Sequence, residues 1–241
     1  MSFLLQMENI HKRFGKRAIL QGLCFHVHPG EIVGLLGSNG AGKSTAFQII
    51  MGMLKPDAGA VFLQGQDLVS KKIHERALLG LGYLAQEPSV LLDLSVEDNL
   101  LCILELLPLR KKERIERLYA LLEELKLTAL KDKKAKTLSG GEKRRLEITR
   151  CLIRSPTLLL LDEPFANIDP LSIEEVKELM RHLKKRGIGI LITDHNAREL
   201  FSIVDRSYLL QSGKALVSGS TEEIVQDAQA KKHYLGASFQ L

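Results

Sequence analysis

Residues 37–44 read GSNGAGKS, directly after the apolar run EIVGLL at residues 31–36. The segment fits the pattern G-x-x-x-x-G-K-[ST], and its flanks predict a buried strand before the loop and a helix after it. Glycines let the backbone curl so that several amides point inward, and the helix N-terminus adds positive partial charge. Such a loop suits nucleotide phosphates, whereas a chance glycine-rich turn would lack the flanking strand and helix. The predicted binding residues are Gly37, Ser38, Asn39, Gly40, Ala41, Gly42, Lys43, Ser44 and Thr45.

The acidic residues that such a loop needs follow in the run TLLLLDEP at residues 157–164. Its leucines predict a parallel strand buried on both faces, and open α/β sheets bind ligands at the carboxyl ends of such strands. Asp162 at this end can hold Mg²⁺ together with the Ser44 hydroxyl, while Lys43 reaches the outer phosphates. Glu163 can orient and deprotonate an attacking water. Two acidic residues end many strands without a function, but their pairing with the phosphate loop favours nucleotide hydrolysis.

A second glycine pair stands in LSGGEKRRLEI at residues 138–148. Ser139 and Glu142 have the spacing of a capping box, so a helix is expected to begin here. Gly140 and Gly141 would leave the amides of the first helical turn uncovered, which makes a second anion site. An ordinary capped helix explains the same residues from helix physics alone, and both interpretations stay open at this point.

The rest of the chain predicts a single domain in which a helical segment interrupts an α/β core. Strand and helix patterns that suit a ligand-binding core occupy residues 1–87 and 155–241, whereas residues 88–154 are mainly helical. The 241 residues are 45% hydrophobic, which suffices for one large domain. Within the helical segment an apolar stripe is formed by Ile115, Leu118, Leu121, Leu122 and Leu125.

Charge and composition narrow the class of protein. The net charge of +5 comes largely from the runs RKKERIER, KDKKAK and EKRR, which are expected to be solvated faces. Aromatic residues do not interleave with them, so we expect no nucleic-acid partner. No apolar run is long enough to cross a bilayer and no signal peptide is visible, so a membrane role would be peripheral. Cys24, Cys102 and Cys151 are expected to be small buried hydrophobes.

In this combination the motifs resemble those of the nucleotide-binding subunits of ABC transporters. The resemblance spans nearly the whole chain and rests on GSNGAGKST, LSGGE, LLLLDEP and TDH, which stand in the family's order. It implies a P-loop ATPase with a RecA-like core, an antiparallel β subdomain and an inserted helical subdomain. It also implies ATP and Mg²⁺ as cofactors and a head-to-tail homodimer. In that dimer, the ATP held by one chain is capped by residues of the other, namely Ser139, Gly140, Gly141 and Glu142.

The same resemblance implies roles for single residues outside the phosphate loop. Phe14 resembles the aromatic that stacks on adenine, with a core ring as the alternative. Gln86 resembles the amide that meets Mg²⁺ and the attacking water, and His195 the switch histidine at the γ-phosphate. Asp169 resembles the aspartate of the loop that faces the partner chain. In that loop Asn167 stands where the family commonly has Gly or Ala.

Segments around these motifs point to a class of transporter. LDEPFANIDP, GILITDHNARELF and the ending HYLGASFQL resemble the ATPase subunits of bacterial lipopolysaccharide exporters, while branched-chain amino-acid importers share TDHN and YLG. We therefore expect an ATPase that drives lipopolysaccharide export from the cytoplasmic face of the inner membrane, with an amino-acid importer as the alternative. A soluble ABC ATPase of DNA repair or translation would usually carry a long coiled-coil insert or a second ATPase unit. A P-loop kinase would not carry LSGGE.

Two transmembrane subunits are the partners that this class of transporter implies. We expect them to dock on the loop after Gln86, where EPSVLLDL places Val90, Leu91 and Leu92. Apolar residues in a loop can receive a short helix of a partner. They can equally belong to the core of the helical segment, and the sequence does not decide between these two interpretations.

Overall fold

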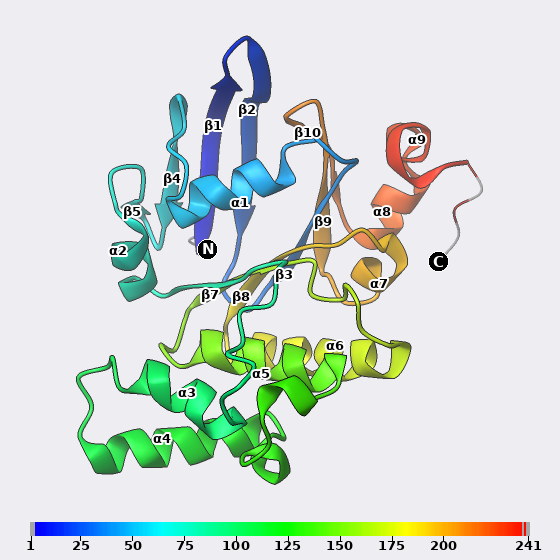
Figure 1. Cartoon of the computed structure of the whole chain (residues 1–241). Coiled ribbons are helices and arrows are strands. Elements are labelled where there is room, and N and C mark those ends of the chain that lie inside the picture. Colours follow the sequence, from blue (N-terminus) through cyan, green and yellow to red (C-terminus); the bar gives the residue numbers. More distant parts are fainter. Residues whose placement is uncertain (1–2, 238, 240–241) are drawn as a thin grey trace.

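An antiparallel sheet of four strands is formed within residues 5–67, near the start of the chain. The computed structural model describes residues 3–237 and 239; Ser238, Gln240 and Leu241 of the SFQL tail lie outside the described residues. The sheet has the order β2-β1-β4-β5 and occupies the upper part of Figure 1. Its strands are β1 (Leu5–Phe14), β2 (Arg17–Val27), β4 (Ala58–Leu63) and β5 (Gln66–Asp67).

A six-stranded, mostly parallel sheet forms the centre of the molecule. Its order is β10-β9-β3-β8-β7-β6, and only β10 runs antiparallel to its neighbour. The parallel strands bring their carboxyl ends to one edge, which is where such sheets bind ligands. The strands are β3 (Ile32–Leu36), β6 (Leu81–Leu84), β7 (Leu158–Asp162), β8 (Gly189–Thr193), β9 (Arg206–Gln211) and β10 (Lys214–Gly219).

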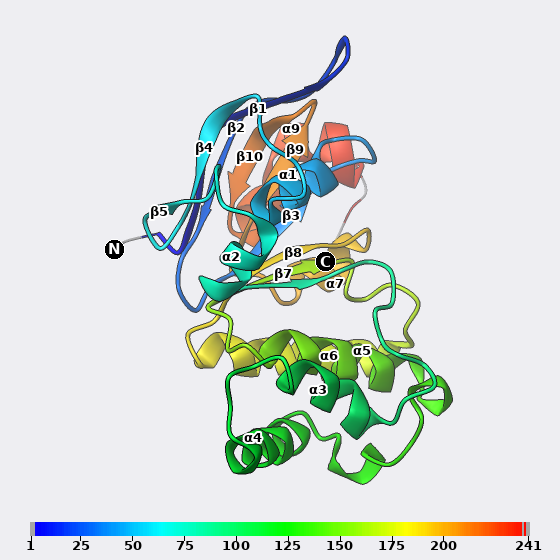
Figure 2. The same ribbon diagram turned by 60° about the vertical axis from the view of Figure 1, so that its left-hand side comes forward.

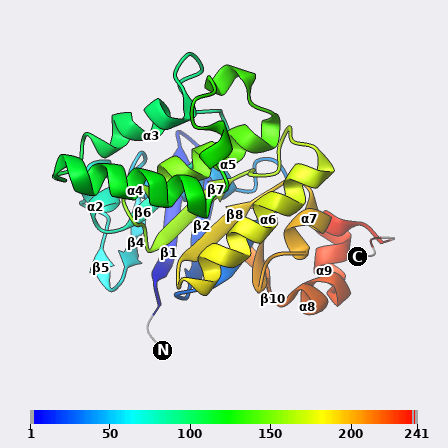
Figure 3. The ribbon, with the colours of Figure 1, turned by 90° about the horizontal axis from the view of Figure 1, so that it is seen from below.

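Helices cover both faces of this sheet. Figure 2 shows α1 between the two sheets, and α5 and α6 on the opposite side with α3 and α4 beyond them. Figure 3, seen from below, shows α4, α5 and α6 lying across the sheet. The helices are α1 (Lys43–Met51), α2 (Ile73–Leu78), α3 (Val96–Leu104), α4 (Lys111–Glu124), α5 (Gly140–Leu152), α6 (Pro170–Lys185), α7 (Ala197–Phe201), α8 (Thr221–Gln226) and α9 (Ala228–Ala230). Shorter turns are the 3-10 segments η1 (Thr128–Leu130) and η2 (Ala135–Thr137) and the π-helical η3 (Lys231–Leu235).

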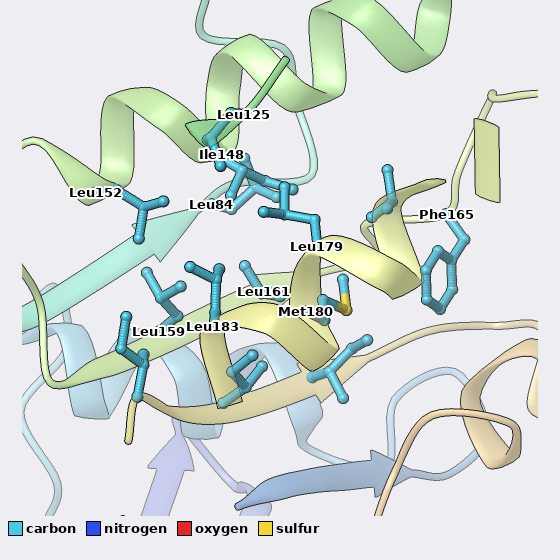
Figure 4. Packing of buried hydrophobic residues seen from close by; sticks show 14 of the residues in the cluster. Leu84, Leu125, Ile148, Leu152, Leu159, Leu161, Phe165, Leu179, Met180 and Leu183 are labelled. Atoms are coloured by element: carbon cyan, nitrogen blue, oxygen red, sulfur yellow. The ribbon is translucent and has the colours of Figure 1, made fainter. Parts of the chain in front are cut away.

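Two hydrophobic cores lie on the two faces of the central sheet, and alternate residues of each strand divide between them. In β7, Leu158 and Leu160 join the core under α1, whereas Leu159 and Leu161 join the core under α5 and α6. Both pairs are fully buried, which explains why the strand reads as a continuous apolar run. Figure 4 shows Leu159 and Leu161 facing Met180 and other side chains of α6. The carboxyl end of β7 is therefore held by packing on both sides.

Most local predictions agree with these elements, and two do not. Ser95 caps α3 as its sequence pattern indicates, accepting a hydrogen bond from the backbone N–H of Asp98 at 2.9 Å. The predicted apolar stripe, which consists of four residues of α4 and of Leu125 directly after it, is buried except for Ile115, which is 37% exposed. The expectation of three buried cysteines was wrong, because Cys24 is exposed on β2 and the other two are half-buried. Among the described residues no helix is long and apolar enough to cross a membrane.

Candidate active site

The phosphate loop connects the end of β3 to the start of α1, as predicted. Gly37 and Gly42 have φ angles of +146° and +111°, which side chains rarely adopt. A Cβ at Gly37 would lie 2.5 Å from the Leu210 carbonyl oxygen, and one at Gly42 would lie 2.6 Å from a methyl carbon of Leu20. Both positions therefore need glycine on two independent grounds, conformation and space.

Lys43 lies at the first position of α1, and its side chain folds back over the loop. Its Nζ donates hydrogen bonds to the carbonyl oxygens of Gly37 at 2.5 Å and Ser38 at 3.3 Å. Burial lowers the pKa of this ammonium, while the charges of Glu163 and Asp162 act in the opposite direction. The arrangement places a half-buried cation at the mouth of the loop, opposite two carboxylates.

The acidic pair at the end of β7 is held by β8. Thr193 Oγ1 donates to Asp162 Oδ1 at 2.6 Å, and the backbone N–H of Glu163 donates to the Thr193 carbonyl at 2.9 Å. Glu163 has a φ of +50°, a conformation that turns the chain sharply at the strand end. Its carboxylate accepts a hydrogen bond from Gln86 Nε2 at 2.9 Å and contacts His195 Nε2. Side chains from the ends of β6, β7 and β8 thus meet at one carboxylate.

An open cavity of about 430 Å³ joins the loop to these side chains. Phe14 lies at its rim with 52% of its surface exposed, so the alternative of a core ring was wrong. Gly37, Ser38 and Ala41 belong to the loop but do not line the cavity. The lining consists of Phe14, Arg17, Ile19, Asn39, Gly40, Gly42, Lys43, Ser44, Thr45, Gln86, Asp162, Glu163 and His195.

Two residues of this lining were missed by the sequence analysis. Arg17 pairs with Phe14 across the tight turn between β1 and β2, and Ile19 follows on β2. The segment FGKR at residues 14–17 could have indicated Arg17, because a tight turn at the glycine places this basic residue beside the aromatic residue Phe14. Arg17 adds positive charge to a cavity that already holds Lys43, which suits an anionic ligand.

The predicted capping box at the start of α5 is confirmed. The backbone N–H of Glu142 donates to Ser139 Oγ at 3.2 Å, and the Ser139 N–H donates to Glu142 Oε2 at 2.7 Å. Gly141 has a further reason to be glycine, since a Cβ there would lie 2.2 Å from Ser172 Oγ on α6. None of Ser139, Gly140, Gly141 and Glu142 lines the cavity of its own chain. The second glycine pair is therefore a capped helix start, closely packed on α6 and separate from the phosphate loop.

The loop before α6 is fixed by a second cap. Asp169 accepts hydrogen bonds from the hydroxyl of Ser172 at 2.6 Å and from its backbone N–H at 3.1 Å, and these bonds lower the pKa of the carboxyl group. Asn167 has a φ of +59°, a conformation that Asn tolerates better than most residues. Asn167, at a position where the family commonly has Gly or Ala, thus fits the observed backbone.

The three apolar residues after Gln86 divide between core and surface. Val90 is only 9% exposed and packs in the core with α3 and α5. Leu91 and Leu92 are 44% and 50% exposed. The Asn99 side chain forms two hydrogen bonds with the backbone of Leu91. It accepts one from the Leu91 N–H at 2.8 Å and donates one to the Leu91 carbonyl at 2.9 Å. Val90 therefore belongs to the core of the helical segment, which was the alternative for all three residues, whereas Leu91 and Leu92 have the exposure that docking requires. Docking at these two leucines stays a prediction.

Comparison with known proteins agrees with this geometry. The family model described as ABC transporter matches residues 20–166. The chain belongs to the ABC transporter family of ATP-binding proteins. It is 52% identical over 241 residues to the lipopolysaccharide export system ATP-binding protein LptB of Acidithiobacillus ferridurans, covering 100% of both chains. It is 42% identical over 238 residues to LptB of Escherichia coli K12, covering 98% of this chain and 99% of the other.

Solved structures of ABC ATPases share the whole fold. The ATP-binding cassette MJ1267 in its ADP conformation superposes with a TM-score of 0.88 at 31% identity, covering 98% of this chain and 100% of the other. The predicted α/β fold of an ABC nucleotide-binding domain, with an antiparallel and a mixed sheet, is confirmed. As a member of this family the chain is an ABC transporter ATPase that binds ATP. ABC ATPase subunits dimerise and pair with transmembrane subunits in their transporter complexes.

Proposed function

We propose that this ABC ATPase drives lipopolysaccharide export, the process for which its full-length LptB relatives are named. The observation that supports this most is the extent of the similarity, which includes the core, the helical segment and the region after the ATPase motifs. Residues 1–87 and 155–241 act in this proposal as the ATP-binding core, and residues 88–154 as the helical subdomain. The ATPase works at the cytoplasmic face of the inner membrane, attached to two transmembrane subunits.

Hydrolysis in the proposed site uses the side chains that meet at Glu163. The Glu163 carboxylate accepts the proton of the attacking water, while Gln86 and His195 orient the water and the γ-phosphate. Lys43 and the loop amides hold the outer phosphates. The exposed ring of Phe14 stacks on the adenine.

The oxygen donors of the cavity fit a magnesium ion. Ser44, Gln86 and Asp162 line the same cavity and offer a hydroxyl, an amide and a carboxylate, the hard ligands that Mg²⁺ prefers. Within residues 3–237 and 239 no group of three or more His, Cys, Asp or Glu could hold a metal ion. Bound nucleotide would add its phosphate oxygens to these donors. When bound, the ion neutralises charge that develops on the phosphates.

A head-to-tail homodimer gives the start of α5 its role. Ser139, Gly140, Gly141 and Glu142 lie outside the cavity of their own chain, and in the proposed dimer the amides of this helix start contact the ATP of the partner. Asp169, at the start of α6, packs beside the same region and faces the partner in this arrangement. Closure around two ATP molecules and separation after hydrolysis then move the helical subdomains relative to each other.

Transport can be tested with the native assembly. The chain is purified with its membrane partners, the partners are identified, and the complex is reconstituted in vesicles that contain lipopolysaccharide. We expect release of lipopolysaccharide that requires ATP and is absent with a non-hydrolysed ATP analogue. Multi-span permeases that co-purify and take up branched-chain amino acids instead would assign the chain to the importer class.

Leu91→Asp is expected to block assembly with the membrane subunits without unfolding the isolated chain. A carboxylate in an apolar interface must be desolvated without a partner, which disfavours docking. The backbone of Leu91 is held by Asn99 and its side chain is exposed, so the fold does not depend on the leucine. Co-purification and thermal unfolding are the two measurements.

Leu216→Asp is the matched control for this change. Leu216 is 40% exposed, close to the value for Leu91, but it lies on β10, far from the helical segment in Figure 1. The control variant should assemble like the wild type. Retained assembly of Leu91→Asp, or a large fall in its melting temperature, would reject docking at Leu91.

A further inference from the structure

Helix α5 holds the end of β6 and the connection from β6 to α3 at several points. Cys151 Sγ lies 3.2 Å from the Tyr83 carbonyl oxygen, and Arg150 donates a hydrogen bond to the carbonyl of Ser89. The backbone N–H of Ser89 donates to Glu147 Oε1 at 2.9 Å. Gln86 lies inside this connection, so α5 determines the path of the segment that carries it.

Arg144 on the same helix reaches the other side of the active site. Its guanidinium donates to the carbonyl oxygens of Glu163 at 2.6 Å and Pro164 at 2.9 Å, and to that of Ala85 at 3.4 Å. The side chain is 6% exposed, although the run EKRR had been expected to form a solvated face. A planar guanidinium with fixed donor directions sets the relative positions of the groups that it binds. Arg144 thus ties the peptide after Glu163 to the peptide before Gln86.

Glu147 links Arg144 to Ser89. Its Oε2 accepts a hydrogen bond from Arg144 at 2.9 Å, its Oε1 accepts the one from Ser89, and its side chain is 4% exposed. A buried carboxylate with both oxygens engaged compensates the buried guanidinium and restrains its orientation. Ala85, which precedes Gln86, and Ser89, three residues after it, are therefore both held by the Arg144–Glu147 pair.

We propose that Glu147 is a positioning residue for ATP hydrolysis, which holds Gln86 and Glu163 in register through Arg144 and Ser89. The inference rests on the proposed roles of Gln86 and Glu163. Glu147 touches neither side chain and does not line the cavity. Its effect is on the approach of Gln86 Nε2 to Glu163 Oε2, which are 2.9 Å apart.

The test is a double-mutant cycle on the full chain with Mg·ATP. Glu147→Gln keeps the volume and an oxygen for Ser89 but removes the charge that holds Arg144. We expect its kcat to fall about tenfold or more, because small misplacements of reacting groups have effects of this size, while KM for ATP stays within about threefold. In a Gln86→Ala background the same change should reduce the residual rate less than about twofold, since Gln86 is then no longer there to be positioned.

A structural role alone predicts a different pattern. Glu174→Gln is the matched control, because Glu174 also pairs with a buried cation three residues away, Lys177, without contacting the segment around Gln86. It should leave kcat unchanged. An unchanged kcat in Glu147→Gln, or a loss that persists in full in the Gln86→Ala background, would overturn the inference. If Glu147→Gln does not fold, Glu147→Asp enters the same cycle. Absence of ATPase activity in the wild type would instead contradict the proposed function.

Discussion

Glu163→Gln is expected to bind Mg·ATP like the wild type and to hydrolyse it about a hundredfold more slowly or worse, the usual effect of losing a general base. The amide has the size of the carboxylate and can keep a hydrogen bond to Gln86. It cannot accept the proton of the attacking water, and it loses the charge that faces His195. Since ATP is bound but not consumed, the closed dimer should accumulate.

Single-turnover ATPase rates and the molar mass in solution, with and without Mg·ATP, measure these two effects. The matched control is Glu178→Gln, which makes the same carboxylate-to-amide change at an exposed residue of α6. It should hydrolyse ATP at the wild-type rate. A Glu163→Gln chain that stays monomeric under both conditions would argue against the two-ATP dimer, and near-normal turnover would exclude Glu163 as the base.

The fold, the phosphate loop and the acidic strand end could be predicted because each depends on residues that are close together in the sequence. A buried parallel strand needs apolar residues on both faces, so Leu158 to Leu161 identify β7 without any tertiary information. The phosphate loop needs glycine where φ is positive, and Gly37 and Gly42 stand at such positions. The capping box of Ser139 likewise involves only residues three apart.

The features that could not be predicted depend on contacts between distant segments. Val90 and Leu91 are neighbours of equal apolar character, and only the packing of α3 and α5 makes one core and the other surface. Arg144 stands in a charged run, yet carbonyl groups at residues 85, 163 and 164 converge on it and make its burial possible. The spacing of residues in the sequence does not predict the direction of those carbonyl groups. The sequence therefore predicts whether a residue lies in a strand or a loop, but it does not predict the hydrogen-bond partners of buried polar side chains.

Lys43→Ala is expected to weaken ATP binding by about 10- to 100-fold and to abolish hydrolysis at ordinary ATP concentrations. A hydrogen bond to a charged group contributes about 1.5–3 kcal/mol, which corresponds to this range of affinity. The lysine is the cation at the mouth of the loop, and burial already lowers its pKa, so its ammonium is incompletely hydrated in the folded chain. Such a cation interacts more strongly with phosphate than an exposed one.

Loss of a charge alone should not have this effect. Lys112→Ala removes a lysine whose side chain is 88% exposed on α4, and it should bind ATP with the wild-type affinity. Equilibrium binding of ATP and steady-state hydrolysis, compared across the two variants, separate the local role of Lys43 from a change in net charge. The variant loses the two hydrogen bonds from Lys43 Nζ to the carbonyls of Gly37 and Ser38. The fold should tolerate this loss, because the loop conformation depends on Gly37 and Gly42. Unchanged affinity in a folded Lys43→Ala chain would mean that the loop amides hold the phosphates without a fixed cation, and the assignment of Lys43 would fail.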